Sequence, residues 1–331
     1  MFNHLYDSVL GLLVLCTLTC AVLIYPVFGP GLTAAYVAAS LLFFLTTAID
    51  KWVDNAVARW SYTLSYLIPG FTAILTPILV GFTVAAVALA QYSGGSYISI
   101  AVRSAFYTSI ILSAYAVVNA LFVRVRKETL NIGIDEPITV AHCSDLHLGA
   151  TLGLNRVKQI VEIIDENDVD FTCLTGDIFD GSGWPQPTSI KPFEQLDDIY
   201  ASLGNHDYYY GDDAITMLEE TTSITLLQNE TVRRDNAVIT GVTDTEYPQQ
   251  IPGEHIRDQD PGETGRLNLL LYHRPEDVDV FLASSYDAML SGHTHGGQLF
   301  SVREIARLTY DFIEGLFQFG DKYLNVSSGA G

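Results

Sequence analysis

Four long apolar stretches at the start of the chain constrain its fold more than any other feature. They cover residues 8–28, 32–49, 66–90 and 104–123. Each has about the 17–25 residues that a helix needs to cross the hydrocarbon layer of a membrane. The alternative is a set of buried helices in a large soluble core, but such helices normally keep a polar stripe that these stretches lack. We therefore expect four membrane-spanning helices.

Basic residues that flank these stretches predict their orientation. The connection between the second and third stretches carries Lys51 and Arg59, and the exit from the fourth carries Arg124, Arg126 and Lys127. Short basic flanks are typical of the cytoplasmic side of a membrane, and an even number of spans places both flanks on that side. The rest of the chain is therefore predicted to lie in the cytoplasm, at the cell membrane.

The charge of the chain is divided unequally. Residues 1–127 carry six Lys or Arg and three Asp, whereas residues 128–331 carry 11 Lys or Arg and 35 Asp or Glu. We therefore expect a four-span transmembrane domain at 1–127 and an acidic α/β domain at 128–331. An acidic surface repels phosphate backbones, so no nucleic-acid polymer is expected as a partner. The sequence carries no signal for the oligomeric state.

The acidic part begins with the pattern of a strand, a helix and a second strand. ITVAHCSDLH (138–147) and DFTCLTGD (170–177) are apolar runs that end in polar residues, as buried strands do. Between them, apolar residues recur at helical spacing over 155–167. This succession predicts two neighbouring parallel strands. Further strands are expected at 198–203, 224–228, 237–242, 267–272, 287–291 and 322–327, and a long surface loop at 244–266.

Polar side chains gather just after several of these predicted strands. They are Asp145 and His147, Asp177 and Asp180, Asn205 and His206, His273, and His293 and His295. Each group alone fits a polar turn, and an isolated H-x-H is a weak signal. In an open α/β sheet, however, ligands bind beyond the carboxyl ends of the strands. Because five groups follow five strands, we expect them to meet in one site.

The residue types in these groups favour a site for two divalent metal ions. Two ions about 3.5–4 Å apart need a shared ligand, and a carboxylate can bridge them because it has two oxygens. Asp177, at the end of a central strand, is the expected bridge. Carboxylate, amide and imidazole ligands together favour Mn, Fe or Zn over Ca, with Mn as the first choice.

The order of the motifs is also informative. Along the chain they are D-x-H, G-D-x-x-D, G-N-H-D, a single His and G-H-x-H. This order resembles the calcineurin-like metallophosphoesterase superfamily, from about residue 137 to the end. GHTHGGQ and the preceding apolar stretches are similar to its membrane-anchored prokaryotic branch. The resemblance implies an α/β domain built as a sandwich of two β-sheets flanked by helices.

The resemblance also implies roles for individual residues. The first metal ion would be held by Asp145, His147, Asp177 and His295. The second would be held by Asp177, Asn205, His273 and His293. His206 would stabilise the transition state and protonate the leaving alkoxide, and Asp180 would orient His206. Asp207 is expected to be a structural carboxylate.

These roles imply a membrane-anchored hydrolase that cleaves phosphodiester or phosphomonoester bonds by attack of a metal-activated hydroxide. A lipid-linked or nucleotide-linked phosphoester is the expected substrate, because the site would lie near the membrane. The alternative is a non-catalytic metal-binding module attached to the helices. Phosphoprotein phosphatases of the superfamily carry Arg directly after G-D-x-x-D, where this chain has Gly181, so a protein phosphatase is disfavoured. Arg274, beside His273, is an alternative arginine for clamping the phosphate, but we expect it to face solvent.

Overall fold

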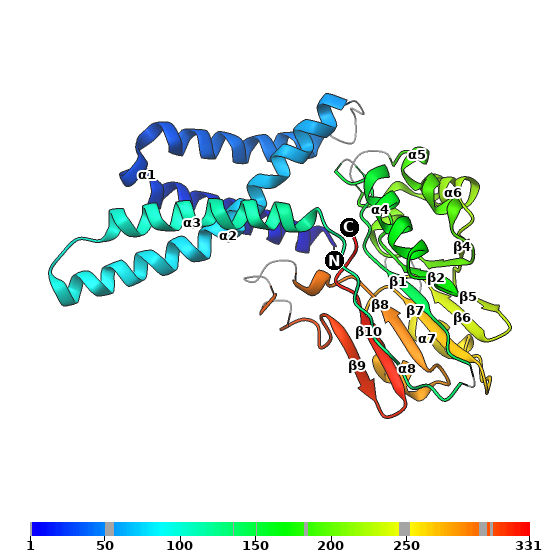
Figure 1. Ribbon diagram of the computed structural model, residues 1–331. Helices are drawn as coiled ribbons and strands as arrows, with labels where there is room; N and C mark the ends of the chain where they lie inside the picture. The colour runs from blue at the N-terminus through cyan, green and yellow to red at the C-terminus, as the bar shows by residue number, and fades with distance from the viewer. Residues whose placement is uncertain are drawn as a thin grey trace. The chain divides into compact units, whose positions relative to one another are not determined.

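The computed structural model describes most of the chain and divides it into two compact units, residues 1–122 and residues 123–331 (Figure 1). The described residues are 2–49, 56–134, 136–149, 151–181, 185–244, 252–297, 303–304 and 307–331. Lys51 and the side chain of Arg59, which contribute to the predicted orientation, lie outside what the structure describes.

The first unit is built from long apolar helices. They are α1 (Phe2–Ile49), α2 (Ala56–Ser93) and α3 (Ile98–Ala120). Within the described residues, three segments are long and apolar enough to cross a membrane, namely Leu10–Thr46, Trp60–Ser93 and Ile98–Ala120. The count of four separate helices is therefore not confirmed.

The difference between four stretches and three helices arises at Gly29. The predicted stretches 8–28 and 32–49 both fall within α1, where Gly29 has φ 76° and ψ −178° between Pro26 and Pro30. Glycine adopts a positive φ without strain, and proline cannot donate a main-chain hydrogen bond, so the helix bends sharply here. In Figure 1 the two arms of α1 run in opposite directions on either side of the bend.

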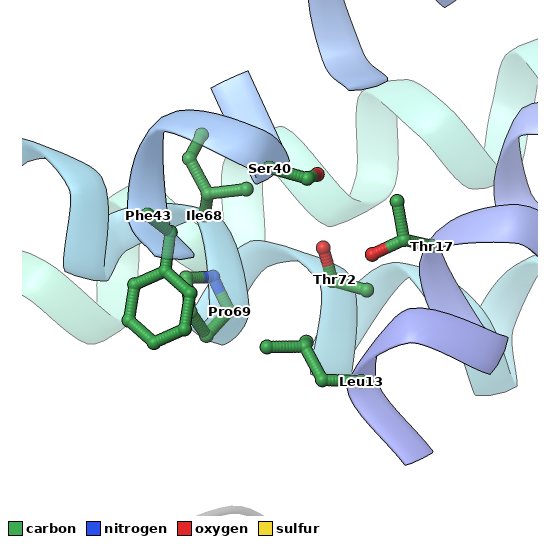
Figure 2. A pocket seen from close by; sticks show the side chains of 7 residues that line it. All are labelled: Leu13, Thr17, Ser40, Phe43, Ile68, Pro69 and Thr72. Atoms are coloured by element: carbon green, nitrogen blue, oxygen red, sulfur yellow. The ribbon is translucent and has the colours of Figure 1, made fainter. Parts of the chain in front are cut away.

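Hydroxyl groups link α1 to α2 in the interior of this unit. Tyr36 and Thr72 share a hydrogen bond of 2.9 Å, and Thr46 and Ser65 share one of 2.6 Å. Figure 2 shows the side chains that line a small gap nearby, which are Leu13, Thr17, Ser40, Phe43, Ile68, Pro69 and Thr72. None of these seven is ionisable, whereas proton and ion pathways through membranes normally contain ionisable residues.

The second unit contains two β-sheets. A four-stranded sheet has the order β1-β2-β3-β4, and all its strands are parallel. Its strands are β1 (Val140–Cys143), β2 (Phe171–Thr175), β3 (Ile199–Ser202) and β4 (Thr225–Leu226). A six-stranded sheet has the order β5-β6-β7-β8-β10-β9, and β6, β7, β8 and β10 are parallel to one another. Its strands are β5 (Glu230–Arg233), β6 (Ala237–Val242), β7 (Leu267–Tyr272), β8 (Ala288–Ser291), β9 (Gly315–Phe319) and β10 (Lys322–Val326).

Helices cover the outer face of each sheet. They are α4 (Leu154–Asp165), α5 (Pro187–Ile190), α6 (Asp212–Thr221), α7 (Pro252–Asp258) and α8 (Val278–Ala283), with short 3₁₀ turns η1 (Lys191–Gln195), η2 (His206–Tyr210) and η3 (His295–Gly297). Apolar residues of α4 and α6 pack on the four-stranded sheet, and those of α7 and α8 pack on the six-stranded sheet. Between the sheets, Phe171 of β2 and Leu269 of β7 belong to one buried cluster. The two-sheet α/β arrangement expected from the resemblance is therefore present.

The predicted strands agree closely with the observed ones. β6 and β7 have the predicted bounds, and β1 and β2 are neighbouring parallel strands with Val140 opposite Phe171. Two strands, β5 and β9, were not predicted. The predicted surface loop at 244–266 is wrong in part, because α7 lies within it and Asp244 is fully buried. Residues 245–251 of that loop lie outside the described part of the chain.

Candidate metal centre

The candidate ligands stand just beyond the carboxyl ends of five strands. Asp145 and His147 follow β1, and Asp177 follows β2. Asn205 follows β3, His273 follows β7, and His293 and His295 follow β8. Because the ligand-bearing strands within each sheet are parallel, these ends meet at one edge of the sandwich.

The main chain at five candidate ligands adopts the left-handed conformation. The φ angles are 52° at Asp145, 45° at His147, 51° at Asp177, 71° at His293 and 49° at His295. Such a conformation costs roughly 1–3 kcal/mol at a residue other than glycine, and it is often found at functional sites. Here it turns the chain sharply after the strands.

The first group of donors consists of Asp145, His147 and His295. Nε2 of His147 lies 3.0 Å from Nε2 of His295. Oδ1 of Asp145 lies 3.3 Å from Nε2 of His295 and 4.0 Å from Nε2 of His147. The main-chain N–H of His293 donates to both oxygens of Asp145, each at 3.1 Å, which fixes the carboxylate against the loop after β8. Three donor atoms from the two sheets therefore point at one small volume.

The second group of donors consists of Asp177, His273 and His293. Nε2 of His273 lies 3.3 Å from Oδ2 of Asp177 and 3.2 Å from Nδ1 of His293. Nδ1 of His273 lies 2.8 Å from the main-chain oxygen of Thr175, so Nδ1 carries a proton and donates it. Nε2 of His273 is therefore the atom directed at the other donors.

Asp177 lies between the two groups. Its Oδ2 is 3.8 Å from Nε2 of His147 in addition to its contact with His273. Its Oδ1 accepts the main-chain N–H of His206 at 2.9 Å, which holds the carboxylate in place. A Cβ atom on Gly204 would overlap this carboxylate, so glycine is required there. Asp177 thus lies within reach of both donor groups, as a ligand that bridges two metal ions must.

Asn205 provides a direct test of whether a cation fits. The residue is 4% exposed, and its Oδ1 is buried without a hydrogen-bond partner among the described residues. Leaving such an oxygen unsatisfied costs about 1–3 kcal/mol. A divalent cation accepts electron density from an amide oxygen, so a bound ion would satisfy this atom. Asn205 therefore fits a ligand role.

The ionisation of the site fits the same interpretation. Burial lowers the pKa of His147 to about 3, and burial together with the nearby His273 lowers the pKa of His293 to about 2. Burial opposes ionisation of Asp177, but the His273 charge and hydrogen bond outweigh it and lower its pKa. Burial likewise opposes protonation of His273, but the Asp177 carboxylate raises its pKa to about 10. The buried carboxylate of Asp177 thus stabilises a positive charge on His273. A bound metal ion would supply that positive charge in place of the proton.

His206 lies at the edge of this cluster and forms a third group of close donor atoms with His147 and Asp177. Its Nδ1 lies 2.8 Å from the main-chain oxygen of Asp180, and its ring stands at 87° to that of His147 with centroids 4.8 Å apart. The contact that orients His206 thus includes the main chain of Asp180. The Asp180 carboxylate accepts a hydrogen bond from the Tyr210 hydroxyl at 3.3 Å.

Asp207 supports the loops that carry two of the ligands. Its carboxylate is fully buried and accepts the main-chain N–H groups of Phe179 at 2.9 Å and Gly204 at 2.8 Å. Burial, with the nearby charge of Asp177, raises the pKa of Asp207 to about 7. This structural position agrees with the prediction for Asp207.

Two further residues at this site differ from expectation. The prediction that Arg274 faces solvent is wrong, because its side chain is 12% exposed and its Nε donates to Asp244 at 2.8 Å. Tyr310 was not predicted at all, yet its hydroxyl lies 3.0 Å from Nε2 of His293. No motif marks Tyr310, because it reaches the site only through the tertiary path of the chain.

Comparison with known proteins identifies the domain that carries this centre. Residues 138–297 match the family model described as calcineurin-like phosphoesterase. This part of the chain is a calcineurin-like phosphoesterase domain. The match includes all seven candidate metal ligands, together with His206 and Asp180.

Relatives of this phosphoesterase domain include membrane proteins. A Helicobacter pylori protein described as an uncharacterized metallophosphoesterase is 30% identical over 207 residues, which cover 60% of this chain and 55% of that protein. A Bos taurus protein described as a transmembrane protein with metallophosphoesterase domain is 30% identical over 207 residues. The match covers 56% of this chain and 47% of that protein. The chain thus spans about half the length of these relatives. The crystal structure of the calcineurin-like phosphoesterase YfkN from Bacillus subtilis has 16% identity and a TM-score of 0.39, covering 58% of this chain and 81% of that one.

Proposed function

We propose that the protein is a membrane-anchored phosphoesterase with two divalent metal ions, Mn being favoured. One observation carries the proposal: two imidazole nitrogens face each other in each donor group. They lie 3.0 Å apart in His147 and His295 and 3.2 Å apart in His273 and His293, and each pair lies beside a buried carboxylate. Without a metal ion, two imidazole nitrogens at such a distance share a proton in an N–H···N hydrogen bond, and a bound cation would take the place of that proton and bind both lone pairs. The mixture of carboxylate, amide and imidazole donors suits Mn, Fe or Zn.

Each ion has a set of candidate ligands. Asp145, His147, Asp177 and His295 would hold the first, and Asp177, Asn205, His273 and His293 would hold the second. Bound ions of this kind lower the pKa of a water molecule and neutralise charge on a phosphoryl group. Asp177 belongs to both ligand sets, and the main-chain N–H of His206 that it accepts would fix the distance between them.

His206 is the candidate for proton transfer to the leaving group. While Nδ1 donates to the main-chain oxygen of Asp180, Nε2 is the nitrogen left to serve a substrate. In its imidazolium form, His206 would donate the Nε2 proton to the leaving oxygen and return as a neutral imidazole. His147 lies at the edge of the His206 ring, which places this proton donor directly beside the first donor group.

The apolar helices suggest where the reaction occurs. Because α1 bends back at Gly29, we propose that its two arms cross the membrane separately, which gives four spans and a phosphoesterase domain in the cytoplasm. α3 ends at Ala120 and the second unit begins at residue 123, so the domain is tethered within a few residues of the membrane. A phosphoester linked to a lipid or a nucleotide is the proposed substrate.

The direct test is an activity assay on the full chain in detergent micelles. The purified protein would be loaded with Mn²⁺ and offered bis-p-nitrophenyl phosphate, p-nitrophenyl phosphate, phospholipids and nucleotide phosphoesters. We expect Mn²⁺-dependent release of product from at least one of them, and none after treatment with EDTA. If metal-loaded protein leaves the whole panel intact, the alternative of a non-catalytic metal-binding module is favoured.

A further inference from the structure

Tyr310 contacts the candidate ligand His293 from the side of the ring that faces away from the other donors. The Tyr310 hydroxyl lies 3.0 Å from Nε2 of His293, and the rings meet nearly edge to face, with centroids 5.6 Å apart and planes at 77°. The other ring nitrogen of His293, Nδ1, lies 3.2 Å from Nε2 of His273. The two nitrogens of His293 therefore serve different partners.

The position of the His293 proton follows from these contacts. A neutral imidazole carries its proton on one nitrogen and a lone pair on the other. Nδ1 faces the group that His293 forms with Asp177 and His273, so the lone pair is needed on Nδ1 if a cation binds there. The proton must then be on Nε2, and the Nε2–H group donates a hydrogen bond to the oxygen of Tyr310. Histidine ligands of metal ions usually donate their second N–H to an oxygen, most often that of a carboxylate, a main-chain carbonyl or water.

We propose that Tyr310 is a positioning residue for the second metal ion. Its hydroxyl oxygen accepts the Nε2–H hydrogen bond of His293 and so fixes the ring with Nδ1 directed at the ion. The inference rests on the proposed function and deepens it. Tyr310 lies beyond the residues, 138–297, that match the family model.

A second contact holds Tyr310 in place. The hydroxyl of Thr294 donates to the main-chain oxygen of Ile313, and Ile313 is buried. Two hydrogen bonds therefore attach the segment around Tyr310 to the loop after β8. One joins Tyr310 to His293, and the other joins Ile313 to Thr294. By contrast, His273 donates its Nδ1–H to a main-chain oxygen, that of Thr175, which no substitution removes. The acceptor for His293 is the side-chain oxygen of Tyr310, so a single substitution can remove this hydrogen bond without changing a ligand.

The test compares Tyr310→Phe with Tyr286→Phe in the full chain in detergent micelles. Tyr286 is a matched control, because its hydroxyl donates to the main-chain oxygen of Gln259 at 2.9 Å and its ring is fully buried. Dissociation constants of Mn²⁺ would be measured by competition with a chelator. We expect Tyr310→Phe to weaken binding of one of two ions by about 10- to 100-fold and to leave the other unchanged. Tyr286→Phe should bind both ions as the wild type does.

Wild-type affinity for both ions in Tyr310→Phe would overturn the inference. A measurement without any variant guards against misfolding. In Zn²⁺-loaded wild-type protein with ¹⁵N-labelled histidine, NMR should show the His293 proton on Nε2, and a proton on Nδ1 would refute the proposal. Protein that binds two ions but hydrolyses no phosphoester would remove the proposed function and leave the role of Tyr310 intact. Wild-type protein that binds no second ion would remove both.

Discussion

Nε2 of His147 and Nε2 of His295 lie 3.0 Å apart, although the two residues follow strands of different sheets. Oδ1 of Asp145 lies 3.3 Å from one of these nitrogens and 4.0 Å from the other. Packing alone gives no reason to bring two imidazoles and a buried carboxylate together in this way. A divalent cation gives such a reason, because both imidazole nitrogens and the carboxylate oxygen would act as its ligands.

His206→Ala separates turnover from metal binding. We expect kcat to fall by about 10²- to 10⁴-fold, because general acid catalysis typically contributes that much. The metal content should remain that of the wild type, since His206 is not among the proposed ligands. His255→Ala, on α7, is the control and should change neither quantity. Equal turnover in His206→Ala and wild type would contradict the proposed proton transfer.

Asn205→Ala should lower the free energy of unfolding clearly only when metal is bound. In EDTA, the substitution removes an unsatisfied buried oxygen, so we expect its free energy of unfolding to stay within about 1 kcal/mol of the wild type. With excess Mn²⁺, the wild type should gain stability from binding and the variant should gain less. Thermal unfolding under both conditions provides the measurement. A variant that is destabilised equally in both would show that Asn205 is structural only.

His142 makes stability depend on pH independently of the metal centre. It lies partly buried between the sheets, with Nε2 2.8 Å from Thr175 Oγ1 and Nδ1 2.9 Å from Asn325 Nδ2. Burial lowers its pKa from 6.5 to about 4. Since folding lowers this pKa, the stability from neutral His142 is present above pH 6.5 and is lost as the pH falls towards 4.

The variant His142→Gln removes that titration. Between pH 6.5 and 4, in EDTA, the wild type should lose up to about 3 kcal/mol more unfolding free energy than the variant does. Chemical denaturation of the full chain in detergent at several pH values gives both curves. Parallel curves for the two proteins would mean that His142 does not titrate in this range.

The bend at Gly29 predicts the location of the N-terminus. If the two arms of α1 cross the membrane separately, the N-terminus and the phosphoesterase domain lie on the same, cytoplasmic side. A tag on the N-terminus and a tag on the C-terminus should then both be protected from protease added to intact cells. An N-terminal tag that is digested while the C-terminal tag survives would indicate a single crossing by α1.

Four of the five ligand-bearing strands, β2, β3, β7 and β8, could be predicted because both of their faces are buried. β7 shows this, since all six of its residues are buried and all but Asn268 are apolar, and the ligand His273 follows directly. β5 and β9 could not be predicted, because they are sheet edges whose residues are mostly half-buried and of mixed polarity. Apolar composition likewise identifies membrane helices but does not distinguish a bend at Gly29 from a loop between two helices.

The site was predictable as far as its residues follow strand ends in a recognisable order. Asp180 and Tyr310 show the limit of that reasoning. The orienting contact of Asp180 uses its main-chain oxygen, which has no sequence signal, and Tyr310 belongs to no motif and reaches His293 only in the folded chain. The burial of Arg274 depends on its partner Asp244, which lies 30 positions away in the sequence.

The most direct test of the account is a crystal of the protein soaked in Mn²⁺ and measured at an anomalous scattering wavelength. The account predicts two anomalous peaks per chain, one beside Asp145, His147 and His295 and one beside Asn205, His273 and His293, with Asp177 contacting both. A single peak, or none at these side chains under saturating Mn²⁺, would contradict it.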